Sequence, residues 1–339
     1  MASQQGVEKA AGDKTREEST SALVALPKIS VIIPTFRRPK SLRRALESCQ
    51  AQVGISPDDF EVVVVDNCPD RTASDTVKEV SAHGRLRFRY ESEPIPGVSA
   101  ARNRGVASAH GQLIAFLDDD EDAEPEWLAA LVAAQRESGS DAVFGAVLGH
   151  FDGPTRDNAQ LHEKEMTRLF TEPSGPVPAR RIASLGSGNS LFRRSCFSGA
   201  EPFDLSLGLA GGEDSALIRK LLAEGRQLNW CPEARVREYF SEERLTMRYL
   251  LKRRFSAGQV RTSLCVSSEH SNKIEALLWM LVGAAQVSVG GMVAIATSPF
   301  SAETARRYLC IASGGLGKIL WMAPFRVRRY PERHKTEQP

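Results

Sequence analysis

Short apolar, β-branched runs alternate with stretches of helical periodicity in the first half of the chain. Residues 29–34, 60–66 and 112–118 are continuous apolar runs, the pattern of strands buried on both faces of a parallel sheet. Residues 39–50 lie between the first two runs and place apolar side chains at helical spacing. Strand, helix and strand in this order form a right-handed βαβ unit, so the pattern predicts a doubly wound α/β domain.

The alternation continues toward residue 250. It predicts strands at 86–90, 142–148 and 189–193, and helices at 99–109, from Pro125 onward and at 213–224. Residues 151–185 are irregular and contain four prolines, so we expect a mobile connection there, a candidate lid over a site. Residues 245–266 read as a basic amphipathic helix.

A length of 339 residues predicts one sizeable α/β domain with an appendage. Residues 1–27 are polar and carry no secretory signal, so we expect a disordered N-terminal tail. Residues 28–245 would form the main domain. Residues 246–339 would form a helical region that is associated with a membrane.

The membrane prediction comes from a segment without charge in the C-terminal third. No charged residue lies between Glu275 and Glu303, and residues 276–297 approach the length of a membrane helix. Basic clusters flank the segment on both sides, whereas a simple crossing concentrates them on one side. A membrane-surface or re-entrant segment and a buried helical hairpin both fit the pattern.

Charge and cysteine usage narrow the class of protein. The formal net charge is only +2, so no global field draws the chain to nucleic acid, and we expect no nucleic-acid partner. The six cysteines are scattered, without the spacing of a zinc site. They indicate reduced thiols in a cytoplasmic, reducing compartment.

Polar residues follow the predicted strands where ligands bind in parallel α/β sheets, beyond the carboxyl ends. Asp66 ends one strand, and Asp118, Asp119 and Asp120 end another. A buried strand that runs into adjacent carboxylates favours a bound divalent cation, because their mutual repulsion is otherwise unrelieved. The alternative is a solvated acidic turn before the helix at Pro125.

Two glycine turns lie beyond these strands. Residues 186–189, Gly-Ser-Gly-Asn, precede a strand and form either a backbone cradle for a ligand or a tight turn. Residues 211–214, Gly-Gly-Glu-Asp, precede a helix, where Glu213 or Asp214 would also serve as a simple N-cap.

The motifs acquire specificity through their order. The chain contains these motifs in the following order: IIPTF at 32–36, VDNCPDRT at 65–72, GVSAARNRG at 97–105, FLDDD at 116–120, GSGN at 186–189 and GGED at 211–214. Together they resemble glycosyltransferase family 2, and in particular the bacterial exopolysaccharide enzymes of the succinoglycan type. The resemblance covers about residues 28–250. It implies a GT-A fold, in which a Rossmann-like nucleotide-binding sheet joins an acceptor-binding half.

The resemblance also implies roles for single residues. Asp214 matches the catalytic base, with Glu213 as the fallback. The nucleotide-sugar would contact Pro34, Thr35, Phe36, Arg38, Asp66, Arg102, Asn103, Asp118 and Asp119. Gly186, Gly188 and Asn189 would line the acceptor, and Asp118 and Asp120 would bind Mg²⁺ or Mn²⁺.

These roles describe an inverting, metal-dependent hexosyltransferase of bacterial polysaccharide biosynthesis. The donor would be a nucleotide-sugar, expected to be a UDP-hexose, and the acceptor an oligosaccharide or lipid-linked glycan at the cytoplasmic face of the inner membrane. The alternative is a non-catalytic, membrane-attached sugar-binding or scaffold protein on the same fold. A nucleotidyltransferase would need a glycine-rich phosphate loop after the first strand, and residues 35–40 do not provide one.

Overall fold

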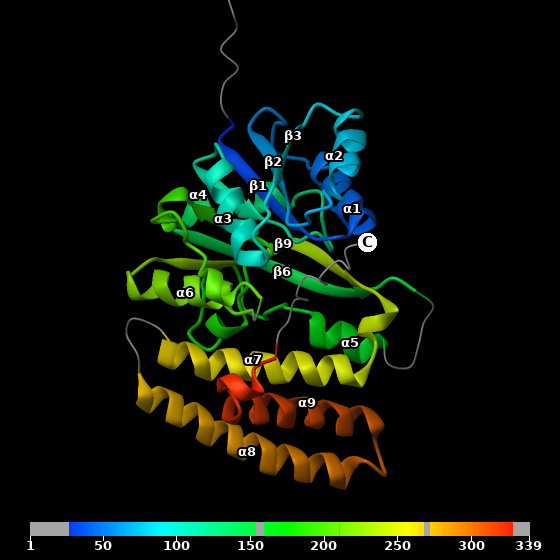
Figure 1. The fold of residues 1–339 in the computed structure, drawn as a ribbon, viewed down its shortest axis with the longest axis vertical. Coiled ribbons are helices and arrows are strands. Elements are labelled where there is room, and N and C mark those ends of the chain that lie inside the picture. Colours follow the sequence, from blue (N-terminus) through cyan, green and yellow to red (C-terminus); the bar gives the residue numbers. More distant parts are fainter. Residues whose placement is uncertain (1–26, 154–158, 210, 268–271, 328–339) are drawn as a thin grey trace, which may run out of the picture.

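The computed structural model describes residues 27–153, 159–209, 211–267 and 272–327. The predicted N-terminal tail, apart from Pro27, lies outside these residues and stays a prediction. Within them, nine strands form one mixed sheet in the order β3-β2-β1-β4-β8-β6-β9-β5, with β7 paired to β9. Helices cover both faces of this sheet, and three further helices lie across the base of the molecule (Figure 1).

The parallel half of the sheet follows the apolar pattern of the sequence. The strands β1 (Ile29–Thr35) and β2 (Phe60–Asp66) are buried along their whole length. The strand β3 (Arg87–Ser92) forms the half-exposed edge, and β4 (Leu113–Phe116) pairs with β1 on the other side. The prediction of a buried parallel core is confirmed.

The other half of the sheet is largely antiparallel. It contains β5 (Glu121–Ala123), β6 (Ala142–Phe151), β7 (Gly175–Pro176), β8 (Ser190–Arg193) and β9 (Leu228–Phe240). The strand β9 pairs with β6 in parallel and with β5 and β7 in antiparallel. The sequence pattern predicts neither β9 nor β5, because charged and apolar residues mix along β9 and because β5 is only three residues long.

Two helical layers cover the sheet. The helices α1 (Pro39–Gln50), α2 (Ser74–Ser81) and α4 (Trp127–Ser138) bury their apolar residues in one core. On the other face, α3 (Val98–Ser108) and α6 (Glu213–Ala223) contribute to a second core. The sheet is therefore sandwiched, as the doubly wound prediction requires.

The segment 151–185 is more ordered than its sequence predicts. It contains α5 (Ala159–Met166), whose Met166 joins a small core with Phe151, Phe240 and Leu245. The expectation of an irregular connection is therefore wrong for this part. These apolar contacts hold α5 in place, and the number of prolines in the segment does not predict them.

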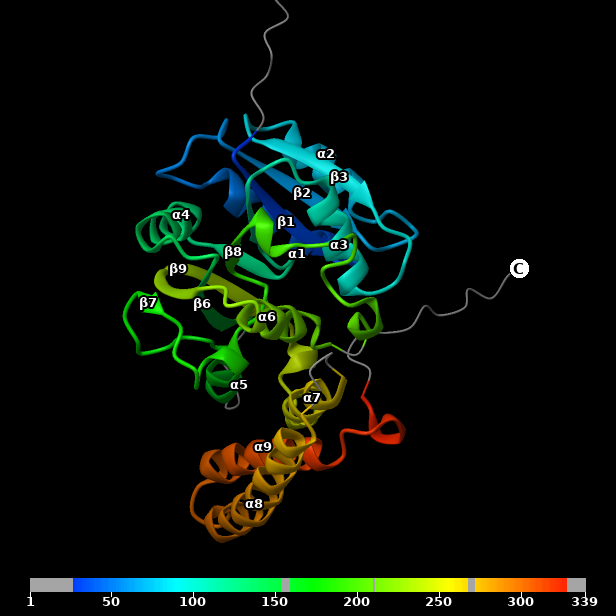
Figure 2. The same cartoon turned by 90° about the vertical axis from the view of Figure 1, so that its left-hand side faces the viewer.

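The C-terminal region is a layer of three helices, α7 (Met247–Ser267), α8 (Lys273–Thr297) and α9 (Ala302–Ile319). The two views agree that this layer lies at the end of the molecule opposite β1 to β3, with α8 outermost (Figure 2). Among the described residues, α8 is the one helix whose length and composition suit a membrane crossing.

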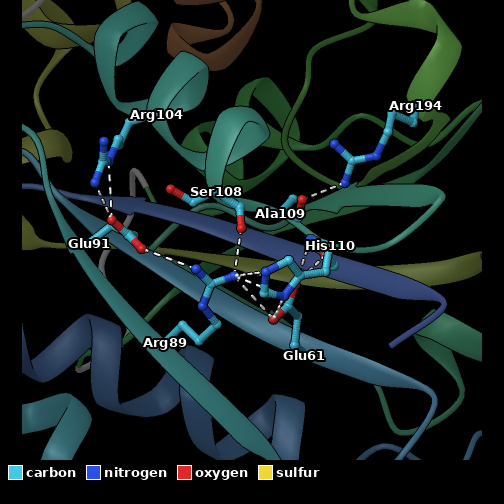
Figure 3. Close-up of polar contacts among 9 residues, drawn as sticks. Glu61, Arg89, Glu91, Arg104, Ser108, Ala109, His110 and Arg194 are labelled. Carbon is cyan, nitrogen blue, oxygen red and sulfur yellow. Dashed lines mark hydrogen bonds and ion pairs between the residues drawn. The ribbon is translucent and has the colours of Figure 1, made fainter. Parts of the chain in front are cut away.

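A polar network secures the end of α3, which carries Arg102 toward the carboxyl edge of the sheet. Arg89 and Arg194 donate to the last carbonyls of this helix, at Ser108 and Ala109 (Figure 3). The buried carboxylate of Glu61 accepts from Ser30 Oγ at 2.7 Å and from the His110 N–H at 2.9 Å. The network satisfies helix-end groups that would otherwise be buried without partners.

Glu61 provides a test of this network. Burial raises the pKa of Glu61, but the hydrogen bonds from Ser30 and His110 and the charge of Arg89 outweigh it, so the net pKa is lowered. A lowered pKa in the folded state means that the ionised form stabilises the fold above about pH 4 and that this contribution is lost on acidification.

We therefore expect Glu61→Gln to lower the free energy of unfolding by about 1–3 kcal/mol at pH 7. The difference from the wild type should shrink as the pH falls below about 4. Urea denaturation at both pH values measures it, with the exposed Glu137→Gln as the matched control. Equal stability of the two variants at pH 7 would contradict the structural role of Glu61.

Candidate active site

The polar ends of three strands meet at one edge of the sheet. Thr35 and Asp66 stand in register at the ends of β1 and β2. Thr35 Oγ1 donates to Asp119 Oδ2 at 2.8 Å, which joins the end of β1 to the acidic turn after β4. The expected meeting of strand ends is therefore present in the structure.

The three aspartates of that turn point in different directions. Asp119 accepts from Thr35 and from Arg38 Nη1, the latter at 3.0 Å. Asp120 lies between Arg38 at 2.9 Å and Arg244 at 3.1 Å. Asp118 instead faces Arg102 at 3.3 Å, and its side chain is 35% exposed. Asp118 and Asp120 therefore pair with different arginines, and their joint role as metal ligands stays a prediction.

Burial dominates the electrostatics of this turn. It raises the pKa of Asp119 against the opposing charge of Arg38. Burial, Asp119 and Glu238 together raise the pKa of Asp120 to about 7, while Arg244 and Arg38 oppose the shift. Burial and Asp118 raise the pKa of Glu121 well above its usual range, opposed by Arg168. Burial and mutual repulsion therefore outweigh the charges of the arginines, so these carboxyls keep their protons to higher pH than free carboxyls do.

Arg102 connects this turn to the start of α6. Its side chain is almost fully buried, and its guanidinium forms ion pairs with Asp118 and with Glu213. Glu213 is likewise buried, whereas the neighbouring Asp214 is partly exposed and accepts from the N–H of Ser215 at 2.7 Å. The two acidic motifs, far apart in the sequence, thus share one arginine.

The glycine turn at 186–188 fills the space between the same groups. A Cβ at Gly188 would lie 2.6 Å from Asp118 Oδ2 and 3.1 Å from Glu121 Oε1. A Cβ at Gly186 would collide with Arg168 and lie 3.1 Å from Asp214 Oδ2. A side chain at either position would displace one of these charged groups, and the turn brings its backbone between Asp118 on one side and Asp214 on the other.

Two charged residues at this turn, Arg168 and Glu121, are not among the predicted site residues. Arg168 Nη2 lies 3.6 Å from Glu121 Oε1, and Glu121 Oε2 accepts from the Asp118 N–H at 3.0 Å. The backbone of Arg168 pairs with Val147 of β6, which holds the guanidinium in place. Glu121 follows the aspartates directly and offered a signal, whereas Arg168 lies in the segment read as irregular.

Other predicted site residues have side chains that serve the fold. Asp66 is fully buried and accepts from the Cys68 and Ala73 N–H groups. Asn103 exchanges two hydrogen bonds with the backbone of Phe203, and Asn189 bonds Trp127 Nε1 and the carbonyls of Ala146 and Ala234. Their polar atoms therefore hold together the backbone segments around the site.

Pro34 and Phe36 lie beside Thr35. Pro34 is buried within β1, opposite Val65, so its ring belongs to the sheet. Phe36 is partly exposed, and the guanidinium of Arg37 lies 5.4 Å from its ring centroid. Of the two, Phe36 offers an aromatic face at the edge where the strands end.

A small cavity adjoins one side of the site. A cavity of about 10 Å³ adjoins the glycine turn, between Arg168, Gly186 and Trp230. Such a volume accommodates one water molecule and no sugar ring. Within the described ranges, no three His, Cys, Asp or Glu side chains are gathered as metal ligands would be.

A single carboxylate nevertheless suits a divalent cation that is held mainly by substrate phosphates, as Mg²⁺ often is. Asp118 has the exposure and position for this role, since it faces the glycine turn and is partly open to solvent. Asp120 would reach the same ion only after its pairs with Arg38 and Arg244 break.

Comparison with protein families gives an independent view. Residues 30–199 match the family model described as glycosyl transferase family 2. The chain is 32% identical over 244 residues to the succinoglycan biosynthesis protein ExoM of Rhizobium meliloti (strain 1021), covering 71% of this chain and 76% of that protein. The resemblance to the succinoglycan type is confirmed by this match.

The chain also resembles a second sequence relative, over a shorter stretch, and a solved structure. The chain is 33% identical over 129 residues to the GalNAc(5)-diNAcBac-PP-undecaprenol beta-1,3-glucosyltransferase of Campylobacter jejuni, covering 38% of this chain and 40% of that protein. Its fold resembles the mannosyltransferase PcManGT of Pyrobaculum calidifontis, solved with GDP-Man and Mn²⁺, with a TM-score of 0.57 and 17% identity. That match covers 88% of each chain and confirms the GT-A fold.

The raised pKa values of the acidic turn predict an unusual pH dependence. Because the folded protein binds protons on Asp119, Asp120 and Glu121 where the unfolded chain has released them, stability should fall as the pH rises from about 4 to about 7. Asp120→Asn removes one of these ionisations. We expect this variant to gain stability relative to the wild type between pH 5 and pH 8, measured by urea denaturation.

Asp75→Asn is the matched control, because Asp75 is exposed and far along the chain from the turn. A loss of stability in Asp120→Asn that is greater at pH 8 than at pH 5 would show that the arginine pairs outweigh burial.

Proposed function

The chain belongs to glycosyltransferase family 2, and we propose that it transfers one hexose from a nucleotide-sugar to an acceptor hydroxyl with inversion at the anomeric carbon. One observation carries this proposal. The glycine turn 186–188 lies against Asp118 on one side and Asp214 on the other, so a leaving group and an attacking alcohol would meet across it. A UDP-hexose is the expected donor, and bacterial polysaccharide biosynthesis the expected process.

On the donor side, Thr35, Phe36, Arg38 and Asp119 would form the wall of the nucleotide site. Asp66 would shape this wall by holding the loop that follows β2. Asp118 would hold Mg²⁺ or Mn²⁺ together with the donor diphosphate. When bound, such a cation stabilises the negative charge of a departing nucleoside diphosphate.

On the acceptor side, Asp214 would take the proton of the attacking hydroxyl. Its carboxylate is partly exposed and directed at the glycine turn, as a base in contact with substrate must be. Glu213 is buried and paired with Arg102, which suits a positioning residue that fixes the start of α6. Attack opposite the leaving group converts an α-linked donor into a β-linked product.

Gly186 and Gly188 would let the acceptor sugar approach the backbone closely. Arg168 lies on the same side, against Gly186 and beside Asp214, and would donate hydrogen bonds to acceptor oxygens. Asn189 would contribute through its backbone position, since its carboxamide is already bonded.

We also propose that the acceptor is lipid-linked or an oligosaccharide and that the enzyme works at the cytoplasmic face of the inner membrane. The exposed apolar helix α8 supports membrane attachment. The undecaprenol-linked substrate in the name of the Campylobacter relative supports a lipid-linked acceptor.

The base assignment is tested by Asp214→Asn. Loss of a general base lowers the rate by about 10²–10⁴-fold, so transfer and donor hydrolysis should fall in that range while donor affinity is kept. Release of nucleoside diphosphate from UDP-glucose, UDP-galactose and GDP-mannose measures turnover, and calorimetry measures donor binding. Asp75→Asn should behave as the wild type. If Asp214→Asn retained full turnover while Glu213→Gln abolished it, the two roles would be exchanged.

The cation assignment is tested by titrating Mn²⁺ into the same assay. We expect turnover to require the cation and Asp118→Asn to raise the Mn²⁺ concentration for half-maximal rate at least tenfold, because a ligand is lost. A smaller shift is expected for Asp120→Asn, whose carboxylate is paired with Arg38 and Arg244. Failure of the wild type to turn over any donor, with donor binding intact, would favour the non-catalytic alternative.

A further inference from the structure

The outermost helix of the C-terminal layer, α8, presents a long apolar face to solvent. Its exposed aliphatic residues include Ile274, Leu277, Leu281, Val289, Met292 and Ile295, with Phe300 in the connection that follows. Ile295 is 77% exposed and Phe300 is 88% exposed. Solvent-exposed apolar surface of this extent marks an interaction site.

The polar side chains of α8 leave little for a protein partner to recognise. Gln286 accepts from Lys318 Nζ of α9 at 2.8 Å, Glu275 pairs with Arg219 of α6, and Thr297 bonds the Val293 carbonyl. A protein interface usually contains several intermolecular hydrogen bonds, whereas lipid tails accept none. The face therefore suits a lipid surface better than a second copy of the chain.

Exposed cations accompany this face. Lys273 begins α8, and Arg307 is exposed on α9, the neighbouring helix. Basic residues at the edge of an apolar face attract anionic lipid head groups. The charge pattern thus complements a bacterial membrane surface.

Close packing ties α8 to its neighbours. A Cβ at Gly283 would lie 2.6 Å from the Gly315 carbonyl oxygen, and one at Gly315 would lie 2.6 Å from that of Gly283, so α8 and α9 touch through their backbones. A Cβ at Gly317 or Gly258 would collide with the Phe255 or Gly314 carbonyl, which fixes α9 against α7. The three helices form one unit.

This unit cannot place α8 across a bilayer. The two helices α8 and α9 are antiparallel neighbours joined by four residues, so a crossing by α8 would draw α9 with its Glu303, Arg307 and Lys318 into the hydrocarbon. The layer is also attached to the catalytic half, because Val260 of α7 packs on Gly212, next to Glu213. A Cβ at Gly212 would lie 2.7 Å from Val260 Cγ1.

We infer that α8 lies flat on an anionic membrane surface, with its apolar face in the lipid, and does not cross the bilayer. The inference rests on the proposed membrane attachment and specifies its geometry. In this arrangement α9 and α7 stand between the lipid and the turn that carries Glu213 and Asp214. The layer of α7, α8 and α9 therefore sets the distance from the membrane surface at which the catalytic turn meets a lipid-linked acceptor.

Vesicles and engineered cysteines test the geometry in the full chain. The six native cysteines are buried, so Lys273→Cys or Ser298→Cys supplies a single accessible thiol at either end of α8. Each variant is added to sealed vesicles of phosphatidylethanolamine with phosphatidylglycerol, collected by sedimentation and treated with a membrane-impermeant maleimide. We expect both thiols to react at once, and the wild type to stay unlabelled.

The possible outcomes separate the attachment from its geometry. If one end of α8 reacts only after detergent is added, α8 spans the bilayer and the flat geometry is wrong while attachment holds. If the protein neither sediments with these vesicles nor with neutral phosphatidylcholine vesicles, attachment itself fails, and a dimer in solution would assign the face to a second copy. Donor turnover in solution reports the proposed activity separately.

A paired substitution provides the second readout. Leu277→Asn together with Ile295→Asn should reduce the vesicle-bound fraction at least tenfold and leave donor hydrolysis unchanged, since both side chains are exposed and remote from the acidic turn. Binding that survives this pair would overturn the role of the α8 face.

Discussion

Crowding of carboxylates at the end of a buried strand is the constraint on which the site depends. Asp118, Asp119, Asp120 and Glu121 are consecutive, one residue after β4, and all but Asp118 are largely removed from solvent. Negative charges placed so close together destabilise the fold unless positively charged groups neutralise them. Arg38, Arg102, Arg168 and Arg244 do so from four different parts of the chain, and each of them thereby fixes one wall of the site.

The distribution of these arginines explains how a single turn organises two halves of a glycosyltransferase. Arg38 comes from the start of α1, on the side that would bind the nucleotide, whereas Arg244 and Arg168 come from the half that would bind the acceptor. Arg102 closes the set by linking Asp118 to Glu213 at the base of α6. Among the buried carboxylates, Glu213 lies beside Arg102 and Glu121 beside Arg168, so the loss of either arginine would leave a buried carboxylate without this ion pair.

The parallel core and the motif positions could be predicted from sequence because both depend on local pattern. Continuous apolar runs defined β1, β2 and β4, and the same strands placed Thr35 and Asp118 at one edge. The strand β9 could not be predicted in this way, since its alternation of Arg235, Val236, Arg237 and Glu238 has meaning only beside β6 and β5. Arg168 was invisible for a related reason, because its role comes from pairing with Val147 and from the absence of a side chain at Gly186.

Glycine has different roles in the candidate site and in the C-terminal helical layer. At Gly186 and Gly188 the missing side chain leaves polar groups of different origin exposed to the same small space. At Gly283, Gly315 and Gly317 it lets helix backbones touch, so that α8 is held without any charged side chain of its own along its length after Glu275. A side chain at Gly186 or Gly188 would disturb Asp118 or Asp214, and a side chain at Gly283, Gly315 or Gly317 would separate helices. The site and the C-terminal helical layer therefore constrain the sequence independently.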